Sequence, residues 1–303
     1  MPDSSLPVAR GRVHDAVAEA RSVQPAWYRS GVDVRVRCLG RVREALFARR
    51  LEAAETISRE TGKPVGEALV AEVVTVLDML RFAERMAPGF GRPSRFGSSS
   101  LALWRKRFTT TREPYGVMGI ISPWNYPFML PAGQVIPALV TGNAVVLKPS
   151  ELTPSCGDLL LSLFAEAGLP DGVLQVVHGA GEAGAALVES DLDKVFFTGS
   201  VAAGRRVALR CAERLVPYGL ELGGSDPAIV LDDADVSHAA HGIAWGRFAN
   251  AGQTCVAPKR VYVAASVHDA FVVALERAVG RLRLRRPNDD TWEVGALVTP
   301  RAV

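Results

Sequence analysis

A cysteine surrounded by small residues is the first candidate for chemistry in this sequence. Cys255 stands near the end of the run 248–256, FANAGQTCV. A catalytic thiol needs room for a substrate carbonyl to reach its sulfur and a main chain that can come close, and Ala251, Gly252 and Thr254 leave that room. Most free cysteines are instead buried as small hydrophobes, so the interpretation of Cys255 as a nucleophile depends on the neighbouring motifs.

Two further stretches carry groups that would serve such a nucleophile. Glu221 is followed by one leucine and then by two glycines, Gly223 and Gly224. This sequence would suit a general base on a closely packed backbone. Asn125 stands in the segment 123–127, PWNYP, where its amide could stabilise an oxyanion. The alternative for Asn125 is a turn role, which asparagine commonly has in Pro-rich loops.

A cation and a carboxylate follow an apolar run that has the composition of a buried strand. Lys148 and Glu151 stand just after the run 144–147, AVVL. Parallel strands present ligand sites at their carboxyl ends, so this pair could hold the hydroxyls of a ribose. The alternative is a surface ion pair without a ligand.

Two glycine-rich turns are candidates for binding phosphate. Residues 179–184, GAGEAG, match the GxGxxG pattern between an expected strand and an expected helix. The acidic residue that should follow about 20 residues later is missing, because that region holds a second turn, 199–204, GSVAAG. This second turn precedes a helix N-terminus and is at least as good a place for a phosphate group.

The overall composition is that of an ordinary globular protein and excludes several classes of partner. The chain has 303 residues, 48% of them hydrophobic, and its 35 basic and 32 acidic residues give a net charge of only +3. This balance gives no reason to expect a nucleic acid or an anionic membrane as partner, and the basic run 281–286 is interpreted as a solvated edge. Residues 1–20 have no apolar core of a signal peptide, so a cytoplasmic location is expected.

Cysteine and histidine usage argues against a metal site and against disulfides. The four cysteines have no paired spacing, so we expect reduced thiols. His238 and His241 follow three aspartates, but acidic residues that open a helix are explained by the helix dipole. We therefore expect no metal ion.

Hydrophobic periodicity predicts the elements that must position these groups. Residues 8–90 have helical spacing, with a break at 61–64, TGKP. A linker over 88–100 precedes a segment of strand composition, 101–110, which is expected to form an exposed ribbon. From residue 117 onward short apolar runs alternate with helical patterns, which indicates a doubly wound parallel sheet. The expected strands are 117–121, 144–147, 174–177, 195–197, 228–231 and 260–264, and the expected helices are 128–139, 156–167, 182–188, 201–215, 236–249 and 268–282.

Taken together, the motifs resemble those of the NAD(P)-dependent aldehyde dehydrogenase family from about residue 20 to the C-terminus. Five motifs carry the resemblance and follow the family's order: 122–127 SPWNYP, 142–151 GNAVVLKPSE, 196–200 FFTGS, 221–224 ELGG and 252–255 GQTC. Family members continue for roughly half as long again, so the catalytic domain is expected to be truncated and the turnover of this chain to be weak. Ser225 and Lys259 replace a lysine and a glutamate that are common in relatives.

The resemblance implies a role for each matching residue. Cys255 would attack the aldehyde carbon, Asn125 and the Cys255 N–H would hold the oxyanion, and Glu221 would activate water for thioester hydrolysis. The implied cofactor is NAD, with NADP as a possibility, and the GxGxxG at 179–184 would then be structural. The implied catalytic residues are Cys255, Glu221, Asn125 and Lys148; the implied cofactor-binding residues are Ser122, Trp124, Lys148, Ser150, Glu151, Gly199, Ser200, Gly204 and Leu222.

The resemblance also implies a fold class and a domain plan. The fold expected is α/β, with a doubly wound Rossmann-like cofactor domain, the first part of an α/β catalytic domain, and a β-ribbon oligomerisation arm. The domain boundaries expected are 1–97 and 115–222 for the cofactor domain, 98–114 for the arm and 223–303 for the catalytic part. A small aldehyde is the expected substrate and a homo-oligomer the expected assembly. A nucleotide-binding fragment without turnover, and a cysteine hydrolase with a histidine base, are the competing interpretations.

Overall fold

The computed structural model describes residues 10–284 and 292–300. Five parallel strands form the central sheet in the order β5-β4-β3-β6-β7. The chain therefore first winds outward from β3 through β4 to β5, and then reverses to β6 and β7, so that the switch point lies between β3 and β6. The expected parallel sheet is confirmed, with strands β3 (Val117–Ile121), β4 (Ala144–Lys148), β5 (Leu174–Val176), β6 (Lys194–Gly199) and β7 (Tyr218–Leu222).

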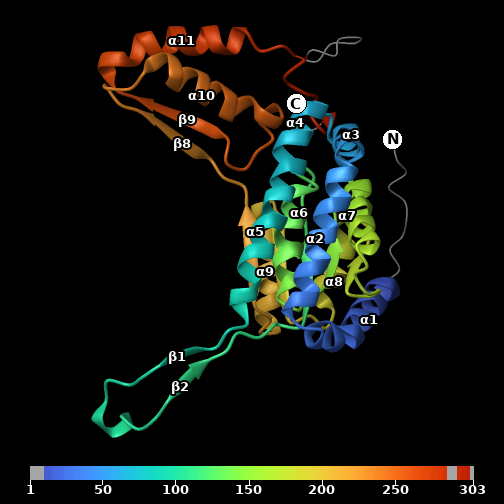
Figure 1. Cartoon of the computed structure of the whole chain (residues 1–303). Helices are drawn as coiled ribbons and strands as arrows, with labels where there is room; N and C mark the ends of the chain where they lie inside the picture. Colours follow the sequence, from blue (N-terminus) through green and yellow to red (C-terminus); the bar gives the residue numbers. More distant parts are fainter. Residues whose placement is uncertain (1–9, 285–291, 301–303) are drawn as a thin grey trace.

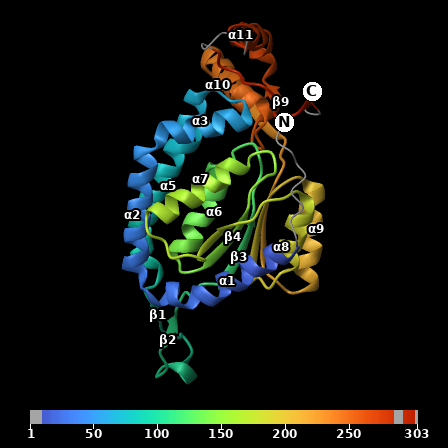
Figure 2. The ribbon, with the colours of Figure 1, turned by 90° about the vertical axis from the view of Figure 1, so that its right-hand side faces the viewer.

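Helices cover both faces of this sheet, because alternate strand residues bury their side chains on opposite sides (Figure 2). Met118 and Ile120 of β3 pack into the larger core, while Val117 and Ile121 pack into the smaller one. The helices of the larger core are α2 (Val32–Ala48), α3 (Arg50–Thr61), α5 (Thr75–Phe90), α6 (Met129–Val140) and α7 (Pro154–Glu166). Those of the smaller core are α1 (Arg10–Arg29), α8 (Gly181–Glu189) and α9 (Val201–Glu213).

The predicted break at 61–64 separates two helices, and the chain after it is irregular. Helix α3 ends at Thr61, Gly62 takes a left-handed φ of 76°, and α4 (Val65–Ala68) begins after Pro64. The next turn, Leu69–Val74, is a π-helix that continues directly into α5. A π turn rotates the residues that follow it relative to an ordinary helix, and such turns are common at functional sites.

A second, smaller α/β unit follows the central sheet (Figure 1). Strands β8 (Asp226–Val230) and β9 (Pro258–Val263) pair in parallel, and α10 (Val236–Phe248) and α11 (His268–Gly280) complete the unit. Val230 is buried there with Phe271 of α11. On the other side of the strands Ile229 is 70% exposed and lies opposite Tyr262, which is 54% exposed. Among the described residues these strands therefore have one uncovered apolar face.

The ribbon differs from the predicted one. Strands β1 (Ser94–Phe96) and β2 (Phe108–Thr110) pair antiparallel, with the rings of Phe96 and Phe108 stacked 5.4 Å apart, and they project away from the sheet (Figure 1). The prediction of a strand over 101–110 is wrong outside β2, because the chain must reverse direction between two pairing segments. The 3-10 turn Leu101–Leu103 lies in this reversal, and the partner strand comes from the expected linker. The domain boundaries remain a prediction.

Adjacent residues of β8 provide a test of the uncovered face. Ile229→Lys should change the free energy of unfolding by no more than about 0.5 kcal/mol, because the side chain is exposed. It should also reduce self-association in size-exclusion chromatography, since it places a charge on the apolar face. Val230→Lys is the matched control and should destabilise the chain by about 3–5 kcal/mol, because it buries an unpaired charge. Equal unfolding curves for the two variants would contradict this packing.

Candidate active site

The turn that carries Cys255 begins where α10 ends at Phe248. A 3-10 turn over Ala249–Gly252 follows, in which Asn250 and Ala251 have φ values of 52° and 54°. These left-handed conformations are uncommon for residues other than glycine and are usually held by their surroundings. They turn the chain sharply, so Cys255 lies in a loop after the helix and not within it.

Cys255 is exposed, whereas the other three cysteines are buried. Burial raises the pKa of Cys38, Cys156 and Cys211, which keeps these thiols protonated and unreactive. Accessibility therefore distinguishes Cys255 from the other three thiols. The alternative of a buried small hydrophobe does not apply to Cys255.

Three neighbouring segments contact the cysteine turn. The Tyr126 hydroxyl and the Thr254 hydroxyl share a hydrogen bond of 2.9 Å, which links the loop after β3 to the turn. The Val298 N–H donates to the Gln253 side-chain oxygen at 2.9 Å. A Cβ atom on Gly224 would lie 2.8 Å from the Cys255 carbonyl oxygen, so only glycine allows this approach. The segment after β7 therefore runs directly against the cysteine.

Asn125, in the loop after β3, also contacts the cysteine turn. Its Nδ2 donates to the Gln253 carbonyl at 3.0 Å, and its Oδ1 accepts the Tyr126 N–H at 3.0 Å. An amide nitrogen carries two hydrogens, so the bond to Gln253 engages one of them and leaves the second for an oxyanion. The structure thus brings together Asn125 and the Cys255 turn, as the motifs predict.

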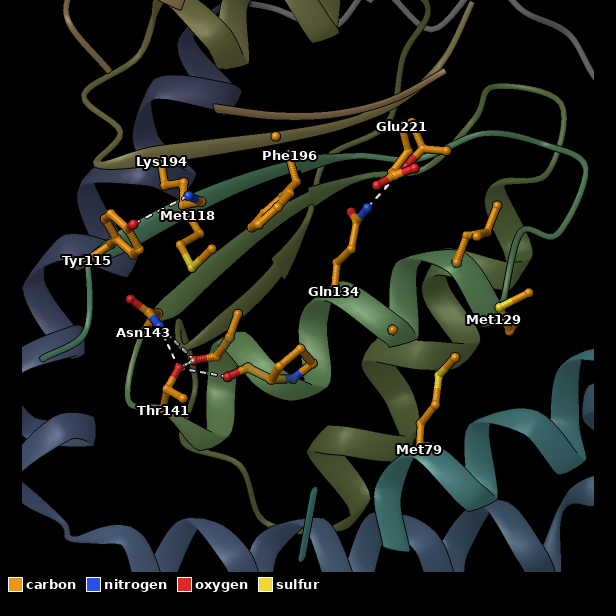
Figure 3. Close-up of a pocket in the computed structure, with 16 residues that line it drawn as sticks. Met79, Tyr115, Met118, Met129, Gln134, Thr141, Asn143, Lys194, Phe196 and Glu221 are labelled. Atoms are coloured by element: carbon orange, nitrogen blue, oxygen red, sulfur yellow. Dashed lines mark hydrogen bonds between the residues drawn. The ribbon is translucent and has the colours of Figure 1, made fainter. Parts of the chain in front are cut away.

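Glu221 lies on β7 at one end of a cavity of about 580 Å³ (Figure 3). The walls are mostly apolar and include Met118 and Met129, while Lys194 lies at the other end. Near Glu221 the Gln134 side-chain nitrogen donates to the Thr198 hydroxyl at 3.0 Å. Within the described residues the Gln134 side-chain oxygen is buried without a partner, so a polar acceptor is available beside Glu221.

A second cavity, of about 740 Å³, lies at the switch point between β3 and β6. Seven of the nine predicted cofactor-binding residues line it: Ser122, Trp124, Lys148, Ser150, Glu151, Gly199 and Ser200. The other two do not line this cavity but contact each other, because a Cβ on Gly204 would meet the Leu222 side chain at 2.6 Å. Gly204 thus allows α9 to pack closely against β7, and the role of both residues in cofactor binding stays a prediction.

Lysine 148 lies in this second cavity and not beside the cysteine. Its Nζ donates to the Pro149 carbonyl at 2.8 Å and lies 3.4 Å from the Glu151 carboxylate. Burial lowers the pKa of Lys148, and the negative charge of Glu151 opposes this shift. The Ser122 hydroxyl in the same cavity is buried without a partner among the described residues. A polar ligand would satisfy both groups.

The GxGxxG motif at 179–184, for which the sequence predicted a structural role, lies at the second cavity. Ala180, Gly181 and Gly184 all line the second cavity. A Cβ on Gly181 would meet nothing within 4 Å, so the start of α8 is open on the side of the cavity. Both glycine-rich turns thus face the same space, one from α8 and one from α9.

The comparisons with known proteins agree with this geometry. A profile of the aldehyde dehydrogenase family matches residues 8–303, so the chain belongs to this family. It is 38% identical to 4,4'-diapolycopene aldehyde oxidase from Methylomonas sp over 96% of this chain and 54% of that protein. It is 37% identical to betaine aldehyde dehydrogenase 2 from Rhizobium meliloti (strain 1021), over 95% of this chain and 59% of the relative.

A solved structure shows the same fold. The crystal structure of an NAD-dependent aldehyde dehydrogenase from Sinorhizobium meliloti matches with a TM-score of 0.91 and 35% identity. The match covers 97% of this chain and 58% of that one. The chain therefore spans little more than half the length of the relatives that it matches.

Several residues of the site were not predicted from the sequence. Lys63, Glu67, Glu72 and Asn250 form hydrogen bonds beneath the cysteine turn and the loop of Asn125. In the sequence, the segment TGKP at 61–64 indicated only a helix break. Nothing in its pattern showed that Lys63 is buried. Lys259, to which the sequence assigned no role, donates to the Gly224 carbonyl at 2.7 Å and so holds the segment that contacts Cys255.

Neither a membrane-spanning helix nor a cluster of metal ligands occurs among the described residues. Over 10–284 and 292–300, no helix has the length and apolar character that a membrane span requires. The same residues contain no group of three His, Cys, Asp or Glu side chains placed to hold a metal ion.

The exposure of Cys255 predicts a simple labelling pattern. In the native chain one of the four thiols should react rapidly with an aromatic disulfide reagent, and the other three should react only after unfolding. Cys255→Ser should abolish the rapid phase, and Cys211→Ser, the control, should preserve it. A rapid phase that survives in Cys255→Ser would refute the assignment.

Proposed function

We propose that this chain oxidises an aldehyde to a carboxylic acid with NAD as the cofactor, through a thioester on Cys255. The observation that carries the proposal is the exposed thiol of Cys255, on a turn whose backbone is contacted by the Asn125 amide and by the segment that follows Glu221. Family membership and the NAD-dependent relative support the same reaction. Because the relatives are longer, the activity of this chain is inferred from the residues that it contains.

The proposed first step is nucleophilic attack by Cys255. Its thiolate forms a bond to the aldehyde carbon, and the carbonyl electron pair moves to oxygen. The second N–H of the Asn125 amide and the Cys255 backbone N–H would donate to this oxyanion. These donors are fixed before the reaction by the bonds of the turn, so little reorganisation is needed.

The proposed last step is hydrolysis of the thioester. Glu221 would accept a proton from a water molecule as the water oxygen attacks the thioester carbon. The carbon–sulfur bond then breaks, and the products are the carboxylic acid and the Cys255 thiolate. The exposed position of Glu221 at the end of its cavity gives water direct access.

The second cavity fits a dinucleotide. Lys148 would donate to ribose hydroxyls and Glu151 would accept from them, which satisfies the buried ammonium group. The capped N-terminus of α9, where the Ser200 hydroxyl accepts the Ala203 N–H at 3.3 Å, would face the pyrophosphate. When bound, NAD would supply the acceptor for the hydride that leaves the substrate carbon.

The proposed partners are a small aldehyde and a second copy of the chain. A small aldehyde is the proposed substrate class. The ribbon of β1 and β2 would pair with a second copy of the chain, since its short strands project from the molecule. The competing proposal is nucleotide binding without turnover, which is favoured by the uncovered face of β8 and β9.

Aldehyde-dependent formation of NADH by the purified chain tests the proposal. Cys255→Ser should abolish it, because a serine hydroxyl is a far weaker nucleophile than a thiolate. Glu221→Gln should keep a first burst of NADH but reduce steady turnover by on the order of 10²-fold, because only hydrolysis needs the base. Exposed Glu55 of α3 provides the control Glu55→Gln, which should behave as wild type. Absence of NADH formation with intact NAD binding would favour the competing proposal.

Glu151 should determine the choice between NAD and NADP. A carboxylate beside the ribose repels a 2′-phosphate but accepts a hydrogen bond from the free hydroxyl, so NAD should bind more tightly. Glu151→Gln keeps the shape of the side chain and removes its charge. It should reduce the ratio of the NADP dissociation constant to the NAD dissociation constant by roughly tenfold, and not more, because solvent partly screens the half-exposed carboxylate. Titrations with both nucleotides at fixed ionic strength measure the ratio. Tighter binding of NADP to the wild type would overturn this assignment.

A further inference from the structure

A buried ion pair lies beneath the two loops of the site. The side chains of Lys63 and Glu72 are both fully buried, and Lys63 Nζ lies 2.5 Å from a Glu72 oxygen. Two charges are retained in a protein interior only where they are paired and their remaining hydrogen-bonding groups are satisfied. The other partners of this pair therefore indicate what it holds in place.

Those partners are backbone groups of the loop after β3. Lys63 Nζ donates to the Asn125 carbonyl at 2.9 Å and lies 4.1 Å from the centre of the Tyr126 ring. The second oxygen of Glu72 accepts the N–H groups of Phe128 at 2.9 Å and Met129 at 3.2 Å. The ion pair thus fixes both ends of the loop, from Asn125 to the start of α6.

A second carboxylate from the same segment holds the cysteine turn. Glu67 accepts the Asn250 N–H at 2.6 Å, at the residue whose φ is 52°. Asn250 Nδ2 in turn donates to the Asn125 carbonyl at 2.8 Å. The Asn125 carbonyl therefore receives one donor from Lys63 and one from the cysteine turn, and the two loops meet at this oxygen.

We propose that Lys63, Glu67 and Glu72 are positioning residues of the reaction, which hold the Asn125 amide at the Cys255 turn. The meaning of this inference for catalysis rests on the proposed function. No hydrogen bond joins any of the three to Cys255. Their substitution therefore removes none of the reacting groups, but it changes how those groups are arranged. The second cavity has none of the three in its wall, so nucleotide binding should be independent of them.

Glu67 offers the sharpest variants because it is only half-buried. Glu67→Ala should speed hydrogen exchange over residues 249–256 and change the alkylation rate of Cys255 by iodoacetamide, each by roughly tenfold, since a charge-assisted hydrogen bond is lost. Glu67→Gln keeps an acceptor oxygen and should restore most of both values. In turnover, Glu67→Ala should lower kcat by a similar factor and leave the NAD titration unchanged.

Glu60 provides a matched control from the same part of the chain. Its carboxylate accepts the N–H groups of Ser155 at 2.9 Å and Cys156 at 3.1 Å at the start of α7, and it bonds neither loop. Glu60→Ala should lower thermal stability yet keep the Cys255 alkylation rate within about twofold of wild type. If Glu60→Ala changes that rate as much as Glu67→Ala, the effect is general loosening and the proposal is overturned.

The ion pair is tested by removing both of its charges together. Lys63→Met or Glu72→Gln alone leaves one buried charge without a partner, and either variant can fail to fold. The double variant Lys63→Met/Glu72→Leu leaves none and should fold, but it should still show fast exchange over residues 122–129 and a lowered kcat. Wild-type exchange and kcat in the folded double variant would overturn the role of the pair.

These measurements separate the inference from the proposed function. Exchange and alkylation report on the loops without any turnover, so they test the positioning role even if Cys255→Ser proves that Cys255 is not the nucleophile. Conversely, wild-type exchange in Glu67→Ala, together with Cys255-dependent NADH formation, would overturn only the positioning role.

Discussion

Burial on both faces is the constraint on which the central sheet depends. Its strands run parallel, and parallel strands need connections that cross from one face to the other, so helices cover both sides. All five strands then end at the same edge of the sheet. The segments of Ser122, Lys148 and Gly199 meet there, because the chain reverses its winding between β3 and β6. The second cavity is a consequence of this topology.

The proposed nucleophile comes from outside this sheet and needs a separate means of alignment. Cys255 belongs to the unit of β8 and β9, and backbone approaches and hydrogen bonds tie its turn to the first unit. Gly224 permits the close approach, and the helical segment 61–74 lies beneath both loops. In the proposed reaction, a displacement of the Asn125 amide by about 1 Å would remove most of its benefit to the oxyanion. The polar contacts between the units therefore matter for the proposed chemistry.

The sequence predicted the parts of this arrangement that depend on local patterns. The strand Val117–Ile121 is a short apolar run with clear boundaries, and the helix after Ser200 starts at a capping serine, so both were predicted within a few residues. The ribbon failed because a run with strand composition says nothing about its partner, and the partner is Ser94–Phe96 from the expected linker. Glycine motifs also lack a local sign of what they face, so the sequence did not indicate that the turn at 179–184 lines the second cavity.

Lys63 shows why the rest of the site lay beyond sequence patterns. Lysine is rarely buried, so in TGKP it signals a helix break and a solvated charge. Its burial depends on Glu72, which a π turn places nearby, and on the Asn125 carbonyl, far away along the chain. A loop that packs between two units must also satisfy its own backbone groups, and apolar side chains offer nothing to the Asn125 carbonyl or to the first N–H groups of α6. The charged pair is retained because it supplies a donor and an acceptor at the same place. A hydrophobic pair of equal volume would leave the Phe128 and Met129 N–H groups unpaired and would remove one of the two donors to the Asn125 carbonyl.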